Sequence, residues 1–345
     1  ERSRGLGDVY KRQDPTLTTK SPHVAGLDLF NPTNAPDLTG GDFTNLGTTN
    51  ITVKSEQGAT YGIVADSAHE STIRNDGTLT INVAKIESDA TYGTWGIKGN
   101  HNTTLVNTGA LSIESASAGD GFLQGIALYG SETSRGSFRN DGTTSITLSA
   151  NDGLDPATAT NAGAIGLHLR YGDGVNAGDM TFNIDGLRTD AIKFENGSTF
   201  TNSGSITVNS KASEGNDQAI YVVSGSTFTN AESGHFTYNY INEDPLLTTA
   251  SSDGLSTTGG SSSVNQGTID IHLKDLAQRE TGKFMKGFYV GDKATFTNSG
   301  VINLTSETQG SVEAIDGAVA VNGVFENLGD VTLDVTSHGL SLIHI

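Results

Sequence analysis

The chain has 345 residues, and its 39 acidic and 20 basic side chains give a formal net charge of −19. This charge repels nucleic-acid phosphates and anionic lipid headgroups, so we expect no nucleic acid among the partners. Only 34% of the residues are hydrophobic, 44 are glycine and none is cysteine. Such a composition argues against an ordinary globular core, so any order has to come from a repeat. No apolar run is long enough for a membrane helix, and we expect no membrane insertion of this segment.

The two ends of the chain share nothing with the sequence between them. Residues 1–13 contain GLGDVYKRQ and residues 338–345 contain SLIHI, and both segments look like translated sequencing adapters. We therefore interpret 1–13 and 338–345 as non-native tails of an internal fragment. Residues 14–39 are expected to form an irregular lead-in, and residues 40–337 the folded region.

The tripeptide Asn-x-Gly recurs along the folded region at intervals of 26 to 36 residues. We interpret it as a structural corner, in which asparagine amides stack on one another and glycine accepts a positive φ. One copy departs from the spacing, because two additional residues separate Asn230 from Gly234. The corner residues are Asn45, Gly47, Asn75, Gly77, Asn107, Gly109, Asn140, Gly142, Asn176, Gly178, Asn202, Gly204, Asn230, Gly234, Asn265, Gly267, Asn298, Gly300, Asn327 and Gly329.

Three short strands are expected in each period. Apolar and polar residues alternate after each corner glycine, as in Ile269-Asp270-Ile271-His272-Leu273, which predicts a strand. A shorter strand, often with Phe, precedes the Asn, and a third opens with a small residue and an apolar one, as in Gly125-Ile126. Three strands per period predict an all-β fold, a three-sided parallel β-helix of about ten coils. The rival is an antiparallel array with Asn-Asp-Gly hairpin turns, but the strands on either side of the turn differ in length.

The outward positions of the long strand carry few ionisable groups. Glu114, Asp270 and Asp334 are its only carboxylates, and they lie several coils apart, so we predict no active site on that face. Its Thr and Asn rows are interpreted as solvated strand residues, with an ice-binding array as the alternative. The acidic residues of the inserts between long and third strands are interpreted as solvated loop acids, with calcium ligands as the alternative; they are Asp152, Asp155, Glu214, Asp217, Glu243 and Asp244.

The third strand carries the one mixed group of side chains. If Ile126, Leu167, Ile192 and Ile220 point inward, aromatic, cationic and acidic residues point outward on four successive coils. Such a group is suited to grip a sugar or a peptide, and the alternative is an ordinary surface ion pair between Arg170 and Glu195. We predict no metal site and no cofactor. The candidate binding residues are Tyr129, His168, Arg170, Lys193, Glu195 and Tyr221.

Repeats such as FTNSGSITV (200–208) and FTNSGVINL (296–304) resemble the passenger regions of bacterial autotransporters, the type V secretion family. The resemblance covers residues 40–337. It implies a right-handed β-helix that a C-terminal outer-membrane barrel exports, and the fragment contains neither that barrel nor an export signal. The family also implies an adhesin, toxin or protease. The Gly-Asp-Ser-Gly motif of its protease variants does not occur in this sequence.

We therefore expect a non-enzymatic adhesin or stalk, displayed on a bacterial surface or secreted, whose partner is a glycan or protein on a host or neighbouring cell. Two alternatives stay open. A polysaccharide-active β-helix enzyme would need carboxylates clustered on adjacent coils. A protein resembling filamentous haemagglutinin would be exported by a separate partner, and the full reading frame would distinguish it from an autotransporter.

Overall fold

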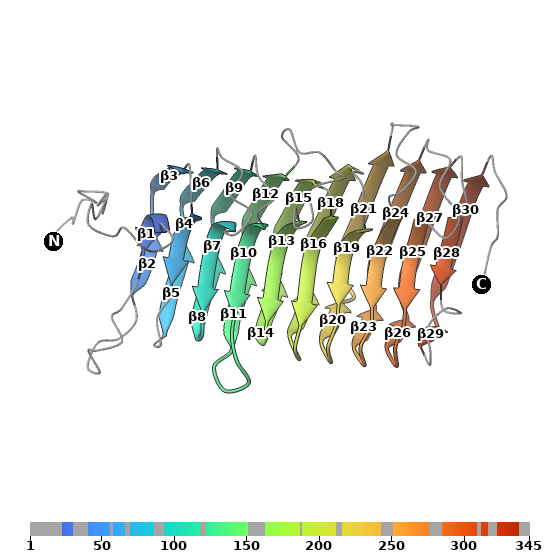
Figure 1. Cartoon of the computed structure of the whole chain (residues 1–345). Helices are drawn as coiled ribbons and strands as arrows, with labels where there is room; N and C mark the ends of the chain where they lie inside the picture. The colour runs from blue at the N-terminus through green and yellow to red at the C-terminus, as the bar shows by residue number, and fades with distance from the viewer. Residues whose placement is uncertain are drawn as a thin grey trace.

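The chain folds into a rod of stacked coils in the computed structural model (Figure 1). Its strands form three parallel sheets of ten strands each, and every coil contributes one strand to each sheet. No described segment is a helix with the length and apolar character needed to span a membrane. The structure describes residues 23–29, 41–55, 58–65, 70–85, 93–117, 122–150, 163–186, 188–211, 216–242, 251–275, 285–308, 312–316 and 323–337.

Sheet A contains the third strand of each period. Its strands, in order, are β1 (His23–Asp28), β4 (Ala59–Ala65), β7 (Thr94–Asn100), β10 (Leu123–Tyr129), β13 (Gly163–Arg170), β16 (Arg188–Glu195), β19 (Asn216–Val222), β22 (Ser251–Thr257), β25 (Met285–Val290) and β28 (Val312–Asp316).

Sheet B contains the short strand that ends at the corner asparagine. Its strands are β2 (Asp42–Asn45), β5 (Ser71–Asn75), β8 (Thr103–Asn107), β11 (Gly136–Asn140), β14 (Gly172–Asn176), β17 (Thr199–Asn202), β20 (Thr227–Asn230), β23 (Ser262–Asn265), β26 (Thr295–Asn298) and β29 (Val324–Asn327).

Sheet C contains the long strand that follows the corner glycine. Its strands are β3 (Thr48–Ser55), β6 (Thr78–Lys85), β9 (Ala110–Ser117), β12 (Thr143–Ser149), β15 (Asp179–Asp185), β18 (Ser205–Lys211), β21 (His235–Asn242), β24 (Thr268–Asp275), β27 (Val301–Thr308) and β30 (Asp330–Ser337).

The strand pairing confirms the parallel β-helix and rules out the antiparallel array. Every pair of neighbouring strands is parallel, and equivalent residues of successive periods lie opposite each other, as Phe200 does to Phe228. In-register stacking of this kind places the side chains at equivalent positions of successive coils above one another along the rod. The right-handed sense of the coil remains the prediction made from the family resemblance.

The solenoid begins before residue 40, the predicted boundary. Strand β1 lies within the expected lead-in and pairs with β4, Leu27 opposite Ile63. The Gly26-Leu27 pair repeats the small-then-apolar pattern of the third strand, but no Asn-x-Gly corner precedes it to reveal the coil. The two predicted tails and the rest of the lead-in lie outside the described residues.

The third strand starts earlier than predicted. In β10 the small residue Gly125 is the third of seven residues and not the first. The pairing of β10 with β7 joins Gln124 to Trp95 and Ile126 to Ile97 and skips Gly125 between them. A β-carbon at Gly125 would lie 2.6 Å from the carbonyl oxygen of Gly166 on the next coil, so the small residue marks a kink at which coils approach closely.

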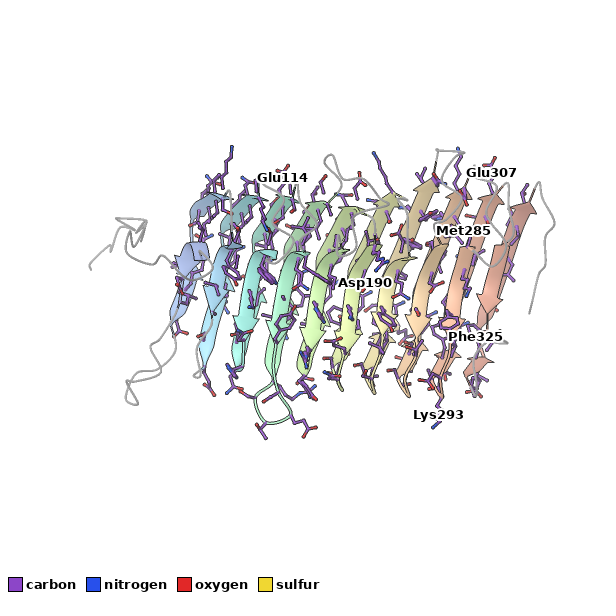
Figure 2. The ribbon with its side chains drawn as sticks, viewed as in Figure 1. Glu114, Asp190, Met285, Lys293, Glu307 and Phe325 are labelled. Atoms are coloured by element: carbon purple, nitrogen blue, oxygen red, sulfur yellow. The ribbon has the colours of Figure 1, made fainter. Side chains whose placement is uncertain are left out.

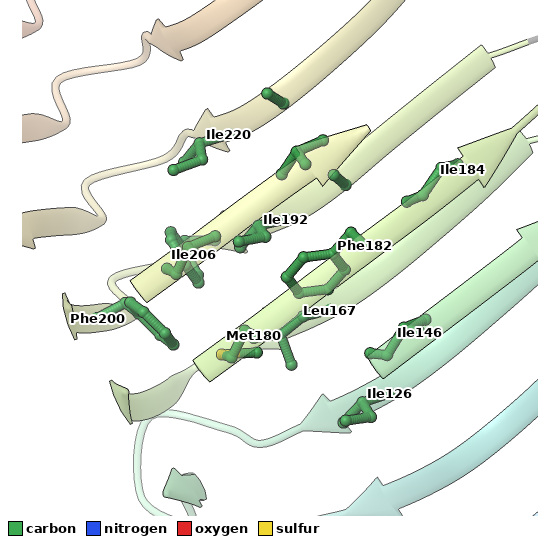
Figure 3. Packing of buried hydrophobic residues seen from close by; sticks show 14 of the residues in the cluster. Ile126, Ile146, Leu167, Met180, Phe182, Ile184, Ile192, Phe200, Ile206 and Ile220 are labelled. Atoms are coloured by element: carbon green, nitrogen blue, oxygen red, sulfur yellow. The ribbon is translucent and has the colours of Figure 1, made fainter. Parts of the chain in front are cut away.

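The core is a continuous apolar column inside the three sheets. Inward residues from all three sheets, among them Leu167, Phe182 and Phe200, are 0% to 1% exposed (Figure 3). Phe200 stacks between Phe138 and Phe228, with ring centroids 6.4 Å apart on each side. Each coil is too thin to bury these rings alone, so the apolar stabilisation comes from the stacking of neighbours.

The corner asparagines form the predicted amide ladder. From Asn45 to Asn327, each side-chain Nδ2 donates to the Oδ1 of the next asparagine at 2.7 or 2.8 Å, through all ten coils. The second N–H donates to a backbone carbonyl of the next coil, for example from Asn75 to Ala110. The insertion after Asn230 leaves this pattern intact.

The corner glycines are required for a different reason from the one predicted. None of them has a positive φ; Gly197, Gly225, Gly259 and Gly260 do, and these lie at the corner between sheets A and B. At Gly142 an added β-carbon would collide with the carbonyl oxygen of Gly109 on the preceding coil. The close approach of one corner to the next therefore excludes a side chain, whereas the backbone angle does not.

We expect Gly142→Ala to destabilise the rod and Gly47→Ala to leave it unchanged. A β-carbon at Gly142 meets backbone that cannot rotate away, whereas nothing lies within 4 Å of the same atom at Gly47. Overpacking of this kind costs about 1 to 3 kcal/mol. Urea unfolding of both variants measures the difference, with hydrogen exchange showing whether the coils around β12 open first. Equal midpoints would contradict the steric argument.

Candidate functional site

The six candidate residues come together on the outer face of sheet A. Tyr129, Arg170 and Glu195 occupy one row across β10, β13 and β16. His168, Lys193 and Tyr221 occupy the adjacent row across β13, β16 and β19. Parallel pairing places residues of one row about 5 Å apart on neighbouring strands, so Tyr129 and Arg170 become neighbours although they are far apart in sequence.

Glu195 is the electrostatic centre of this group. Its Oε1 atom lies 3.2 Å from Nε2 of His168, and its Oε2 atom lies 3.2 Å from Nζ of Lys193. Arg170 is more distant, 3.8 Å from Nε to Oε1, and half of its side chain is exposed. The predicted Arg170–Glu195 pair is thus present, but it is the weakest of three contacts to one carboxylate.

Two further residues extend the group into a hydrogen-bonded network. The indole N–H of Trp95 and the hydroxyl of Tyr129 both donate to Oε1 of Gln124, at 2.7 and 2.6 Å. The Gln124 amide lies 3.4 Å from Nδ1 of His168. We name the eight residues the sheet A network: Trp95, Gln124, Tyr129, His168, Arg170, Lys193, Glu195 and Tyr221.

His168 is not the exposed side chain that the sequence predicted. It is only 6% exposed, because Gln124 contacts it and the ring of Tyr129 packs edge-on with centroids 5.0 Å apart. Burial lowers the pKa of His168, against the opposing effect of Glu195. A neutral imidazole can accept a hydrogen bond at Nδ1 from the Gln124 amide and present an Nε2–H to the carboxylate.

The pKa of Glu195 is lowered to about 2, chiefly by the His168 imidazole against its Oε1 atom and in smaller part by Lys193. The carboxylate therefore stays ionised at every physiological pH, held by donors from its own and the preceding coil. The Lys193 ammonium also lies 5.7 Å from the ring centroid of Tyr221. The network thus joins an ionised acid, two cations and aromatic surface, and can offer both hydrogen bonds and ring contacts to a ligand.

Asp190 is a functional candidate that the sequence analysis missed (Figure 2). It lies on the same strand as Glu195, yet burial raises its pKa to about 7, an effect that Lys193 opposes and that Glu195 and Asp253 reinforce. Lys193, Glu195 and Asp253 act on its carboxyl group through their charges. One strand therefore presents two carboxyl groups with opposite shifts of pKa, which is the usual mark of acid and base partners.

The other candidate positions divide into three groups. The outward long-strand residues are exposed or half-buried, as predicted, and Glu114 is among the exposed ones. Asp217 is not a solvated loop acid: it is fully buried in β19, where the Thr189 hydroxyl donates to it at 2.7 Å. The remaining insert acids lie outside the described residues. In the part of the chain that the structure describes, no three His, Asp or Glu side chains group as metal ligands would.

Comparison with known proteins gives no family assignment, since no family model, no curated protein and no solved structure matches this chain.

We expect Asp190 and Glu195 to give opposite pH dependences of stability. The folded pKa of Asp190, about 7, lies above its ordinary value of 3.8, so its contribution is full below that value and is lost as pH rises through 7. The folded pKa of Glu195, about 2, lies below its ordinary value of 4.5, so its contribution is present above 4.5 and is lost as pH falls towards 2.

Thermal melting across this pH range of the unsubstituted chain, Asp190→Asn and Glu195→Gln tests the expectation. The advantage of Asp190→Asn over the unsubstituted chain should grow from about pH 4 to about pH 7, and the deficit of Glu195→Gln should be largest above about pH 4.5. Each variant controls for the other, because both replace a carboxyl by an amide on β16. Melting curves that stay parallel at all pH values would refute the assignment.

Proposed function

We propose that this chain is the β-helix passenger of a bacterial autotransporter and serves as a non-enzymatic adhesin or stalk. In this proposal it is displayed on the cell surface or secreted, and its partner is a glycan or protein on a host or neighbouring cell. The rod of equal coils supports the proposal, because a solenoid can present one long face without a compact active site. The resemblance of the repeats to autotransporter passengers is the reason for proposing this family.

The observation that carries the binding role is the sheet A network. It gathers Trp95, Tyr129 and Tyr221 with the cations Arg170 and Lys193 over five adjacent coils. Aromatic rings, an arginine fork and a fixed carboxylate are the groups that dominate protein contacts with polar ligands. A ligand that lay across several coils would add weak contacts into a strong total.

We expect the double substitution Arg170→Ala with Tyr221→Ala to weaken binding of the purified chain to cells by about tenfold, since it removes one cation and one aromatic ring from the network. Flow cytometry with the fluorescently labelled chain on epithelial and bacterial cells measures the effect. Arg139→Ala on sheet B is the matched control, because that arginine is also half-exposed and ion-paired, with Asp141. Binding that the double variant retains in full would remove the network from the adhesin proposal.

A second candidate function, a polysaccharide-active enzyme, is favoured by Asp190 alone. A carboxyl group with a pKa of about 7 can donate a proton near neutral pH, while the ionised Glu195 stands on the same strand with Lys193 between them. Hydrolysis of a glycan needs such an acid for the leaving oxygen and such a carboxylate for the attacking water or the sugar.

If the enzyme reading holds, the chain should release reducing ends from at least one polysaccharide of a broad panel, and Asp190→Asn should lower that rate by at least about a hundredfold. Glu114→Gln, an exposed carboxyl on sheet C, should leave the rate unchanged. A reducing-end assay at about pH 6 measures both variants. Absence of release from the whole panel would leave the non-enzymatic role as the only proposal for this face.

A further inference from the structure

The outer face of sheet C is hollowed along the axis of the rod. A concavity of about 740 Å³ runs across β18, β21, β24, β27 and β30, between two outward rows of side chains. One row contains Asn209, Asn239 and His272, and the other contains Ile241 and Lys274. We name this concavity the sheet C furrow. At about 4.8 Å per strand it is about 19 Å long.

The outer face of sheet C has a second hollow in addition to the furrow. A smaller hollow of about 220 Å³ lies at the other end of sheet C, between Asn82 and Glu114 on one side and Lys54 and Ala84 on the other. Strand register places these residues in the same two rows as those of the furrow. The face is therefore concave in two places, whereas an ice-binding array is flat, and this shape disfavours the ice-binding alternative.

The furrow carries hydrogen-bonding groups that the fold leaves unused. Asn239 donates from Nδ2 to Oδ1 of Asn209 at 2.8 Å, and Asn209 donates in the same way to Asn183 at 2.9 Å. A carboxamide has two N–H donors, and the corner asparagines use both. Within the described residues, the stacked amides of Asn183, Asn209 and Asn239 on sheet C are joined through only one N–H donor each. Asn209 and Asn239 therefore each keep one N–H for a ligand.

The remaining lining restricts the ligand. Ile241 is 45% exposed, an unusual apolar surface on a polar face, and supplies contact for the C–H side of a sugar ring. Lys274 lies opposite Glu307 on the next coil, and Asp334 lies in the other row, so the lining has one more negative than positive side chain. A polyanion would meet both this balance and the net charge of −19, and a cation would meet the Lys274 ammonium beside Ile241, so an uncharged ligand fits the lining best.

We propose that the sheet C furrow binds an uncharged oligosaccharide, which lies along the rod axis with its hydroxyl groups on the free amide N–H groups of Asn209 and Asn239. Sugar hydroxyls both donate and accept, so they match amide groups repeated at the coil spacing. The site is separate from the sheet A network, and its existence does not depend on the adhesin proposal.

The experiment is calorimetric titration of the full chain with uncharged gluco-, manno- and galacto-oligosaccharides of about six units, and with heparin and an uncharged extended peptide as competing chemistries. At least one neutral oligosaccharide should bind. The double variant Asn209→Thr with Asn239→Thr should bind it about tenfold more weakly, because threonine keeps a strand-forming side chain but lacks the amide donors. Ile241→Ser, which removes no ladder bond, should weaken binding about fivefold.

Asn50→Thr is the matched control, since Asn50 is an exposed outward residue of the same face that lines neither hollow. It should bind as the unsubstituted chain does. The inference is overturned if no neutral oligosaccharide binds, if only heparin or the peptide binds, or if both furrow variants, with unchanged melting temperatures, retain full affinity. A loss of cell binding in the sheet A double variant would bear on the adhesin proposal and not on oligosaccharide binding in the furrow.

Discussion

The buried asparagine ladder sets the height and register of every coil over the next. A carboxamide taken out of water must find partners for both its donors and its acceptor, and each corner asparagine does so only when the next coil is in register. A slip by one residue would also turn the apolar rows outward. The corner glycines belong to the same close stacking, because backbone hydrogen bonds such as that from Thr143 to Gly109 hold neighbouring corners too close for a β-carbon.

Because the ladder fixes the coils at one corner, the outer faces are free to vary. Asparagine amides stack both at the buried corner and on the outer face of sheet C, but their hydrogen-bond donors are used differently in the two places. At the corner both amide donors are used and the side chains are buried, whereas on sheet C one donor per amide is used and the side chains are half-exposed. The first arrangement is structural, and the second leaves hydrogen-bonding capacity that a ligand can use.

The regular parts of the fold were predictable, and the kinked part was not. A period that repeats Asn-x-Gly and alternating apolar residues indicates coils, strands and the amide ladder directly. Strict alternation, however, places Asp190 on the same side as Ile192, inside the core. In the structure two consecutive residues, Ala191 and Ile192, face inward at the kink of sheet A, which puts Asp190 and Lys193 outside together. Trp95 was missed for the same reason, since Gly96 and Ile97 form the corresponding pair.

The chemistry of a side chain in such a rod depends on what neighbouring coils place in the same row. Glu195 and Asp190 are five positions apart on one strand, yet the first has a pKa of about 2 and the second of about 7. Glu195 has Arg170 beside it in register and His168 within reach, whereas the register neighbours of Asp190 are Ile165 and Gln218. Sequence proximity therefore says little about these two acids. Once the period supplies the register, the rows across the sheet decide which carboxyl is held ionised and which keeps its proton.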